Sequence, residues 1–489
     1  MSNKWLKTRK EGNDVIVERC SKKAKGKVII PFGVTCIDDS AFYGCKDVTS
    51  IIIPDSVTSI GDDAFDETAW YENQPDGVVY AGKVALCYKG DMPRNTSITL
   101  KEGTLGIADW AFHSCVNLNA ITIPEGCLRI GNDSFSDCVT LTTINIPESV
   151  VSLDTAAFDG TPWLARQHEP VVYVGSVAYF SCTRSGKTDS IHIKEGTKTI
   201  YADTSACRAF ESVELKSLFI PDSVTSISEY AFEGLNNLES IVVDENNPVF
   251  DSRDNCNAII ETATNRLLLG CKNTVIPRGV VRIEQAFNLS KGLTSLYIPD
   301  SVTSFDNYAF WGLCDLESIV VDENNPVFDS RNNCNAIYES ATNKLVLGCK
   351  NTIIQKGTKR IGAHAFDRRQ NLKSIVLPEG IQYIDELAFL HCTNLRSVVF
   401  PHSLKKIGYG AFEGCTNLRT VVFPESLKEI GSEAFYNCEK LESVSLPEGL
   451  KTIDFNAFAR TGLRSVSIPK SVERLDDDAF DEKVHITRK

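Results

Sequence analysis

The sequence predicts a solenoid, in which short parallel β-strands stack turn upon turn and each unit buries its apolar edge against its neighbours. A unit of about 23 residues recurs along almost all of the 489-residue chain. Each unit carries an Ala-Phe pair, once Ser-Phe, and most units contain a proline that follows an alternating apolar segment. The phenylalanines of these pairs, called the landmark phenylalanines below, are Phe42, Phe65, Phe112, Phe135, Phe158, Phe210, Phe232, Phe287, Phe310, Phe366, Phe389, Phe412, Phe435, Phe458 and Phe480.

Within one unit the elements follow in a fixed order. Residues 395–400 alternate apolar and outward positions and are rich in β-branched residues, which predicts a strand that ends at Pro401. A second short extended segment, 404–407, leads to Gly408, a position that holds Gly or Asp in other units and that we expect to need unusual backbone angles. The segment from Ala411 to Cys415 then suits a short helical or 3₁₀ turn.

Four segments interrupt the regular spacing and predict β-hairpin insertions, near residues 69–96, 162–189, 244–274 and 322–352. They form two matched pairs, the first two after a Trp and the last two nearly identical to each other. We therefore expect an N-terminal cap at 1–26, a solenoid over 27–489 and a short C-terminal cap at 481–489, since solenoid ends need polar covers.

The chain has 17 cysteines, an odd number that rules out complete internal pairing. Six of them lie three residues after a landmark phenylalanine, where a free thiol can act as a small buried group. In the second pair of insertions, Cys256 and Cys271, like Cys334 and Cys349, lie symmetrically about expected turns at 262–265 and 340–343. Each pair is a candidate disulfide, with buried free thiols as the alternative.

Bulk charge and the distribution of reactive residues narrow the function classes. A net charge of −13 argues against a general nucleic-acid binder. No apolar run is long enough for a membrane span or a signal-peptide core, so we expect no membrane insertion. We expect no cofactor, no metal site and no catalytic residues, because neither metal-ligand spacing nor a nucleophile-base set recurs.

One row of outward strand positions is a candidate binding surface. The residue between the two inward apolar groups of each strand is apolar or aromatic over a long part of the chain, whereas a purely solvated face favours polar residues. This stripe consists of Phe219, Val242, Tyr297, Val320, Val376, Val399 and Val422. β-Propensity is the alternative explanation for the valines, and explains Phe219 and Tyr297 less well.

The repeat resembles the BspA-like class of bacterial leucine-rich repeat proteins, with residues 54–65 as a near-consensus copy. The resemblance implies a leucine-rich-repeat-type, right-handed stack and a non-enzymatic adhesion or recognition scaffold that binds protein or peptide partners. Members of the class are typically surface or secreted proteins, several of them regarded as adhesins for extracellular-matrix or other cell-surface proteins. Because this sequence shows no leader or anchor, an intracellular, cytoplasmic assembly scaffold is the alternative. The sequence predicts neither the ligand nor the oligomeric state.

Overall fold

The computed structural model describes residues 4–180, 188–202, 215–228, 231–232, 234–288 and 290–489. The chain divides into two compact units. The first comprises Met1–Thr188, Ile193–Val213 and Ser223–Gly234, and the second Asp189–His192, Glu214–Asp222 and Leu235–Lys489. No strand pairing among the described residues crosses from one unit to the other, so each unit holds its own sheets.

The first unit contains five sheets, most of whose neighbouring strands are parallel and come from successive turns. Their strands are β1 Leu6–Glu11, β2 Asp14–Cys20, β4 Cys36–Ile37 and β6 Ser59–Ile60; β3 Gly26–Ile29 and β5 Val48–Ile52; β7 Gly77–Ala81, β8 Val84–Lys89, β10 Gly106–Ile107, β12 Arg129–Ile130 and β14 Ser152–Leu153; β9 Thr96–Thr99, β11 Leu118–Thr122 and β13 Thr143–Asn145; β15 Val171–Val174, β16 Val177–Phe180, β18 Thr199–Ala202 and β20 Ser226–Ile227.

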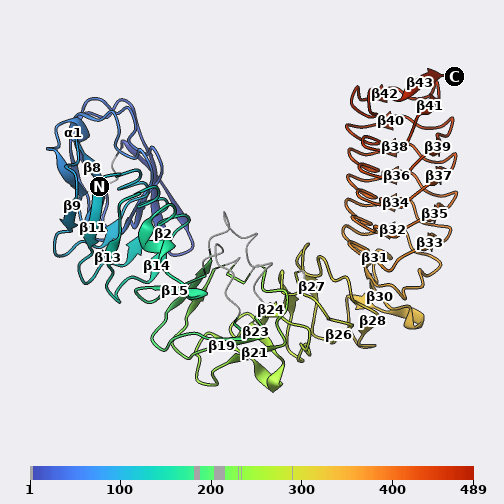
Figure 1. Ribbon diagram of the computed structural model, residues 1–489, viewed down its shortest axis with the longest axis horizontal. Helices are drawn as coiled ribbons and strands as arrows, with labels where there is room; N and C mark the ends of the chain where they lie inside the picture. Colours follow the sequence, from blue (N-terminus) through green and yellow to red (C-terminus); the bar gives the residue numbers. More distant parts are fainter. Residues whose placement is uncertain (1–3, 181–187, 203–214, 229–230, 233, 289) are drawn as a thin grey trace. The chain divides into compact units, whose positions relative to one another are not determined.

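The second unit has the same two kinds of ladder, one of longer strands that end near the prolines and one of two-residue strands. Its strands are β17 Ser190–His192, β19 Ser217–Ile220 and β21 Ser240–Val243; β22 Phe250–Asp251, β23 Ala258–Glu261, β24 Arg266–Gly270, β25 Arg282–Ile283 and β27 Ser304–Phe305; β26 Ser295–Ile298 and β28 Ser318–Val321; β29 Phe328–Asp329, β30 Ala336–Glu339, β31 Lys344–Gly348, β32 Arg360–Ile361, β34 Tyr383–Ile384, β36 Lys406–Ile407, β38 Glu429–Ile430, β40 Thr452–Ile453 and β42 Arg474–Leu475; β33 Ser374–Val376 and β35 Ser397–Val399; β37 Thr420–Val422 and β39 Ser443–Ser445; β41 Ser465–Ile468 and β43 His485–Arg488. Figure 1 shows β32 to β42 and β33 to β41 as two separate rows along the C-terminal stack.

The described residues contain very little helix. Helices α1 Ala69–Glu72 and α2 Pro162–Ala165 begin after Thr68 and Thr161, whose hydroxyls accept backbone N–H groups as N-caps. The 3₁₀ helices η2 Arg253–Asn255 and η3 Arg331–Asn333 precede the β23–β24 and β30–β31 hairpins. Antiparallel hairpins also join β7 to β8 and β15 to β16, so regular parallel stacking is interrupted four times by local pairing.

Among the described residues, the segments around the landmark phenylalanines are not helices, contrary to the short helical or 3₁₀ turns expected there. In most of these segments the residues two positions before and two positions after the phenylalanine adopt positive φ, for example Leu387 at 54° and His391 at 52° around Phe389. Their N–H groups, and that of Phe389, point to the next turn and donate to the carbonyls of Tyr409, Glu413 and Ala411, each at 2.8 Å. The alternation of right- and left-handed residues therefore builds a third inter-turn ladder, which a helix could not form because its N–H groups bond within the segment.

The recurring glycine before each landmark segment has another reason than the one expected. Gly61, Gly131, Gly362, Gly408 and Gly431 do not have positive φ. A Cβ at Gly408 would lie 2.8 Å from the carbonyl carbon of Asp385 and 2.8 Å from the nitrogen of Glu386. At Gly408 a side chain is therefore excluded because adjacent turns approach closely, and not because of the backbone angles, whereas other units hold Asp at this position.

The landmark phenylalanines form the centre of the core. From Phe366 to Phe480 consecutive rings lie 4.9–5.3 Å apart between centroids and within 6° of parallel. Five of the six cysteines three residues after a landmark phenylalanine are buried, and Cys115 is partly buried. Cys392, Cys415 and Cys438 each donate a thiol hydrogen bond to the carbonyl of the landmark phenylalanine one turn earlier, Phe366, Phe389 and Phe412 respectively. One ring and one thiol per turn thus hold each turn to the one before it.

Candidate functional site

The structure places the seven stripe residues on outward strand positions of the second unit. Val376, Val399 and Val422, on successive strands β33, β35 and β37, are 68%, 56% and 70% exposed. Val242, Tyr297 and Val320 are also exposed, whereas Phe219 is half-buried because its ring stacks on His192 at 5.3 Å. The stripe is therefore a property of the outer strand face, with its most exposed part at the three C-terminal valines.

The stripe is divided into separate groups rather than being one continuous row. Phe219 pairs in register with Val242, Tyr297 with Val320, and Val376 with Val399. The β23–β24 hairpin comes between the first and second pairs in the chain, and the β30–β31 hairpin between the second and third. These pairs lie in three different sheets, and Val422 lies on β37 of a fourth, 23 residues after Val399. Val376, Val399 and Val422, one repeat apart in the C-terminal stack, are called the valine group below.

Charged rows bracket this valine group, and the basic row was missed in the sequence. Lys373, Arg396 and Arg419, all exposed, directly precede the strands that carry Val376, Val399 and Val422. None of them forms an ion pair with another described residue. Beyond the strand ends, the exposed Glu379 and Glu425 follow Pro378 and Pro424, and His402 holds the same position after Pro401. The recurrence of Lys or Arg one repeat apart was the available sequence signal.

Tyr297 is tied to its neighbours more firmly than the valines. Its hydroxyl donates to Asp322 Oδ2 at 2.5 Å, and this hydrogen bond raises the pKa of Tyr297 and lowers that of Asp322. The Arg278 guanidinium also lies 3.8 Å from the same carboxylate. A substitution at Tyr297 would disturb this network, so the valines are the cleaner positions for testing the surface.

The four candidate disulfide cysteines are free and buried in the structure. Each hairpin turn lies where the sequence places it, at 262–265 and 340–343, but the cysteines lie just outside the paired strands. The thiols of Cys271 and Cys349 donate to the carbonyls of Asn257 and Asn335, each at 3.5 Å. Burial raises the pKa values of Cys256 and Cys334 to about 11, which keeps these thiols protonated at neutral pH. Disulfide pairing stays a prediction.

A buried arginine lies where the second of the near-identical insertions interrupts the stack. Arg369 occupies the position three residues after Phe366 that is Cys in many units, and it is only 1% exposed. Its guanidinium donates to the carbonyls of Leu313 at 2.6 Å, Gly348 at 2.9 Å and Asp367 at 2.8 Å. The hydrogen bonds to Leu313 and Gly348 connect the turn before the insertion, the insertion itself and the turn after it, which a thiol could not do.

Asp367 and His364 lie beside this arginine. Burial raises the pKa of Asp367 to about 7 and lowers the pKa of His364. His364 Nδ1 is 4.0 Å from Asp367 Oδ2, and the His364 ring lies 5.3 Å from that of Tyr308. No role was predicted for His364, because a histidine without a recurring partner in the sequence does not indicate which residues lie near it in the fold.

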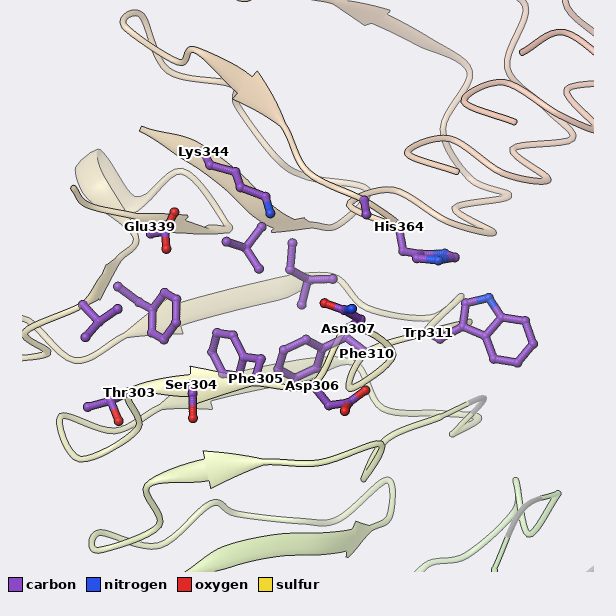
Figure 2. Close-up of a pocket in the computed structure, with 15 residues that line it drawn as sticks. Thr303, Ser304, Phe305, Asp306, Asn307, Phe310, Trp311, Glu339, Lys344 and His364 are labelled. Atoms are coloured by element: carbon purple, nitrogen blue, oxygen red, sulfur yellow. The ribbon is translucent and has the colours of Figure 1, made fainter. Parts of the chain in front are cut away.

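A cavity of about 280 Å³ opens at the same interruption (Figure 2). It is lined by β27 and the turn after it, by the β29–β31 insertion and by the turn that carries His364. Phe305, Phe310 and Phe328 give it an aromatic surface, while Lys344, Trp311 and His364 add polar groups. None of these residues was singled out from the sequence as a binding residue.

The described residues contain no group of three or more His, Cys, Asp or Glu side chains arranged to hold a metal ion. Within the same ranges, no helix has the length and apolar character needed to cross a bilayer. Among the described residues, the outer strand face and the cavity are two features that could recognise a ligand.

The profile of the BspA type leucine rich repeat region matches the chain in six copies, over residues 19–74, 87–204, 167–264, 205–337, 268–355 and 359–487. Solved structures that resemble the chain include a leucine-rich repeat protein from Eubacterium ventriosum, with 22% identity over 83% of this chain and 92% of that chain and a TM-score of 0.39. Another, from Bacteroides ovatus, has 22% identity over 100% and 99% and a TM-score of 0.32. The pneumococcal vaccine antigen PcpA has 16% identity over 100% and 98% and a TM-score of 0.39. The comparison with curated proteins gave no match.

Proposed function

We propose that this chain, which belongs to the BspA-type leucine-rich repeat family, is a non-enzymatic scaffold that binds a protein partner through the outer strand face of its C-terminal stack. Leucine-rich repeat proteins generally bind proteins, and their solenoids are typically binding scaffolds without catalytic activity. The contact surface proposed here consists of Val376, Val399 and Val422 together with the basic row Lys373, Arg396 and Arg419.

The exposure of the three valines is the observation that carries this proposal. Burying one valine side chain against a partner would contribute about 1.5–3 kcal/mol before the losses of association are subtracted. Apolar residues at the centre of a contact surrounded by charged groups match the usual arrangement of a protein interface. The unpaired basic row favours a partner segment that carries acidic residues beside an apolar stretch.

Two settings fit this surface, and the location of the protein separates them. The family resemblance favours an adhesin on the cell surface, whereas the free buried thiols are equally consistent with an intracellular assembly scaffold. Protease shaving and surface labelling of intact native cells would recover the protein from outside in the first case. Retention inside intact cells would remove the adhesin proposal and leave the assembly scaffold.

A partner can be found and the surface tested by photocrosslinking in native cells. A photoreactive residue at position 399 should form an adduct with one defined protein, and the same residue at Phe455, 44% exposed in the same stack but in a landmark turn, should not. Adducts of equal yield at both positions would show that contact is unspecific and would count against the valine surface.

A further inference from the structure

The cavity in Figure 2 exists because one ladder of short strands stops and starts again. β27 is the last strand of the sheet β22-β23-β24-β25-β27, and the next sheet begins with the insertion strands β29, β30 and β31. No strand bridges β27 and β31, so the side chains between them surround a space of about 280 Å³. This volume suits a single side chain or a small molecule, and the space lies entirely within the second unit.

Three phenylalanines make the apolar surface of this cavity. The ring of Phe305 stacks on that of Phe328 at 4.4 Å and meets that of Phe310 edge-on at 5.0 Å. Phe310 and Phe328 are otherwise buried, so the cavity exposes aromatic surface where the rest of the stack closes over it. Such a surface favours an aromatic or branched aliphatic group.

Polar groups without partners face the same cavity. Trp311 Nε1 and His364 Nδ1 are buried and have no hydrogen-bond partner among the described residues. The ammonium group of Lys344 extends toward the aromatic residues and forms no ion pair within the described part of the chain. An indole N–H and an ammonium are both donors, and burial favours the neutral imidazole of His364, which can donate through one nitrogen. Lys344 and Trp311 thus place hydrogen-bond donors along the cavity wall.

The two carboxylates that line the cavity are already engaged, and Asp367, whose pKa burial raises to about 7, lies beside His364 but outside the lining. Asp306 accepts the backbone N–H of Tyr308 at 3.0 Å and lies 3.8 Å from the Arg282 guanidinium. Glu339 accepts the hydroxyl of Thr342. The exposed Lys359 lies with Lys344 along an adjoining hollow, which adds a second positive charge on the same side.

Comparison with the nearly identical insertion near residues 244–274 explains why Lys344 forms no ion pair with another described residue. Its counterpart there, Arg266, pairs with Glu261 at 2.9 Å and with Glu284 at 3.2 Å. Glu284 follows the isoleucine of β25, but at the same place after β32 the chain has Gly362. The two insertions are nearly identical in sequence, yet in the second the basic residue has no carboxylate of a described residue within ion-pair distance, and Lys344 interacts with Asp385 only at longer range.

We propose that this cavity binds an apolar carboxylate, with an aromatic or branched aliphatic group against Phe305, Phe310 and Phe328 and the carboxylate on Lys344. The C-terminal residue of a peptide and a free small carboxylic acid share this chemistry. The cavity shares no residue with the valine surface at 376, 399 and 422, so this binding goes beyond the function proposed above.

Calorimetric titration of the full chain tests the proposal with three probes: the peptide Ala-Ala-Phe with a free C-terminus, the same peptide as its amide, and 3-phenylpropionate. We expect the free peptide or the acid to bind and the amide to bind at least about tenfold more weakly, a difference of ~1.4 kcal/mol, because only a carboxylate can pair with Lys344. Tighter binding of the peptide would identify a peptide terminus as the source, and tighter binding of 3-phenylpropionate a small acid.

Matched substitutions assign the site. K344M should weaken binding of the carboxylate at least about tenfold, whereas R266M in the twin insertion should leave it unchanged. The amide comparison keeps the test valid if either variant folds poorly. Absence of binding by both acids, equal binding of acid and amide, or unchanged binding by folded K344M would overturn the proposal.

Discussion

Replacing Arg369 with methionine should destabilise the second unit strongly. Arg369 donates three hydrogen bonds, to Leu313, Gly348 and Asp367, from a position that is 1% exposed. Hydrogen bonds from a charged group contribute about 1.5–3 kcal/mol each, which would total about 4.5–9 kcal/mol. Removing the guanidinium also removes the free-energy cost of burying it, so the net loss is smaller, but the three buried carbonyls then lose their donor, at about 1–3 kcal/mol for each one left unsatisfied. We therefore expect a loss of about 3–5 kcal/mol, typical of a broken buried hydrogen-bond network.

Urea unfolding followed by circular dichroism, together with amide hydrogen exchange, would measure the effect. Exchange should increase most in residues 310–316 and 345–372, since these segments are joined by the arginine. Arg368, which is half-buried and stacks over Trp311 at 5.3 Å, provides the neighbouring control. R368M should lose about 0.5–1 kcal/mol, the usual contribution of such a cation–π contact. A loss of less than about 1 kcal/mol for R369M would refute the bridging role of this side chain.

Three more outcomes follow from the buried residues. The variant F412A should lower the free energy of unfolding in urea by about 3–5 kcal/mol, because it removes a fully buried ring that stacks on Phe389 and Phe435. F455A, at a half-exposed site, should stay within about 0.5 kcal/mol of the unmodified protein. Equal losses would contradict a stabilising role for the stacked landmark phenylalanines. Burial raises the pKa of Asp367 to about 7, so the contribution of this carboxyl to stability is present at low pH and is lost as pH rises from about 4 to about 7. The variant D367N should flatten that part of the curve of unfolding free energy against pH, and D315N at an exposed site should not. An unchanged slope in D367N would exclude Asp367 as the source of the pH dependence. When the native protein is treated with an alkylating reagent and analysed by peptide mapping, Cys415 and Cys438 should stay unmodified, because burial raises both thiol pKa values well above the usual range. Rapid labelling of either cysteine would contradict its burial between the turns.

Most of the fold could be predicted from local patterns. Strand positions follow from apolar alternation and the following proline, and the hairpin turns at 262–265 and 340–343 lie between the strands as expected. The solenoid and the leucine-rich repeat family are confirmed. These features depend on residues close together in the chain, which is why one sequence was enough.

The conformation of the landmark segments could not be predicted in the same way. Leu387 and His391 adopt positive φ, which non-glycine residues rarely do, because the resulting hydrogen bonds reach a turn about one repeat away. Local propensity favours a helix-like turn and contains no information about that neighbour. The glycine before each segment was misinterpreted for a related reason, since the close approach at Gly408 involves the previous turn.

The binding surfaces were predictable only in part. The outward orientation of the valines follows from strand alternation, but the stacking of Phe219 on His192 depends on a neighbouring strand. Lys344 shows its importance only when the two insertions are aligned, because Gly362 replaces the glutamate that would neutralise it. Arg369 was detectable as an arginine at a position held by cysteine elsewhere, although its three acceptors were not.

The affinity of single lysine variants for the partner crosslinked at position 399 tests the central claim most directly. V376K, V399K and V422K should each weaken binding at least about tenfold, or ~1.4 kcal/mol, because each places a charge in an apolar contact. F455K should bind like the unmodified protein. Unchanged affinity in all three valine variants would contradict the proposal that this strand face is the binding surface.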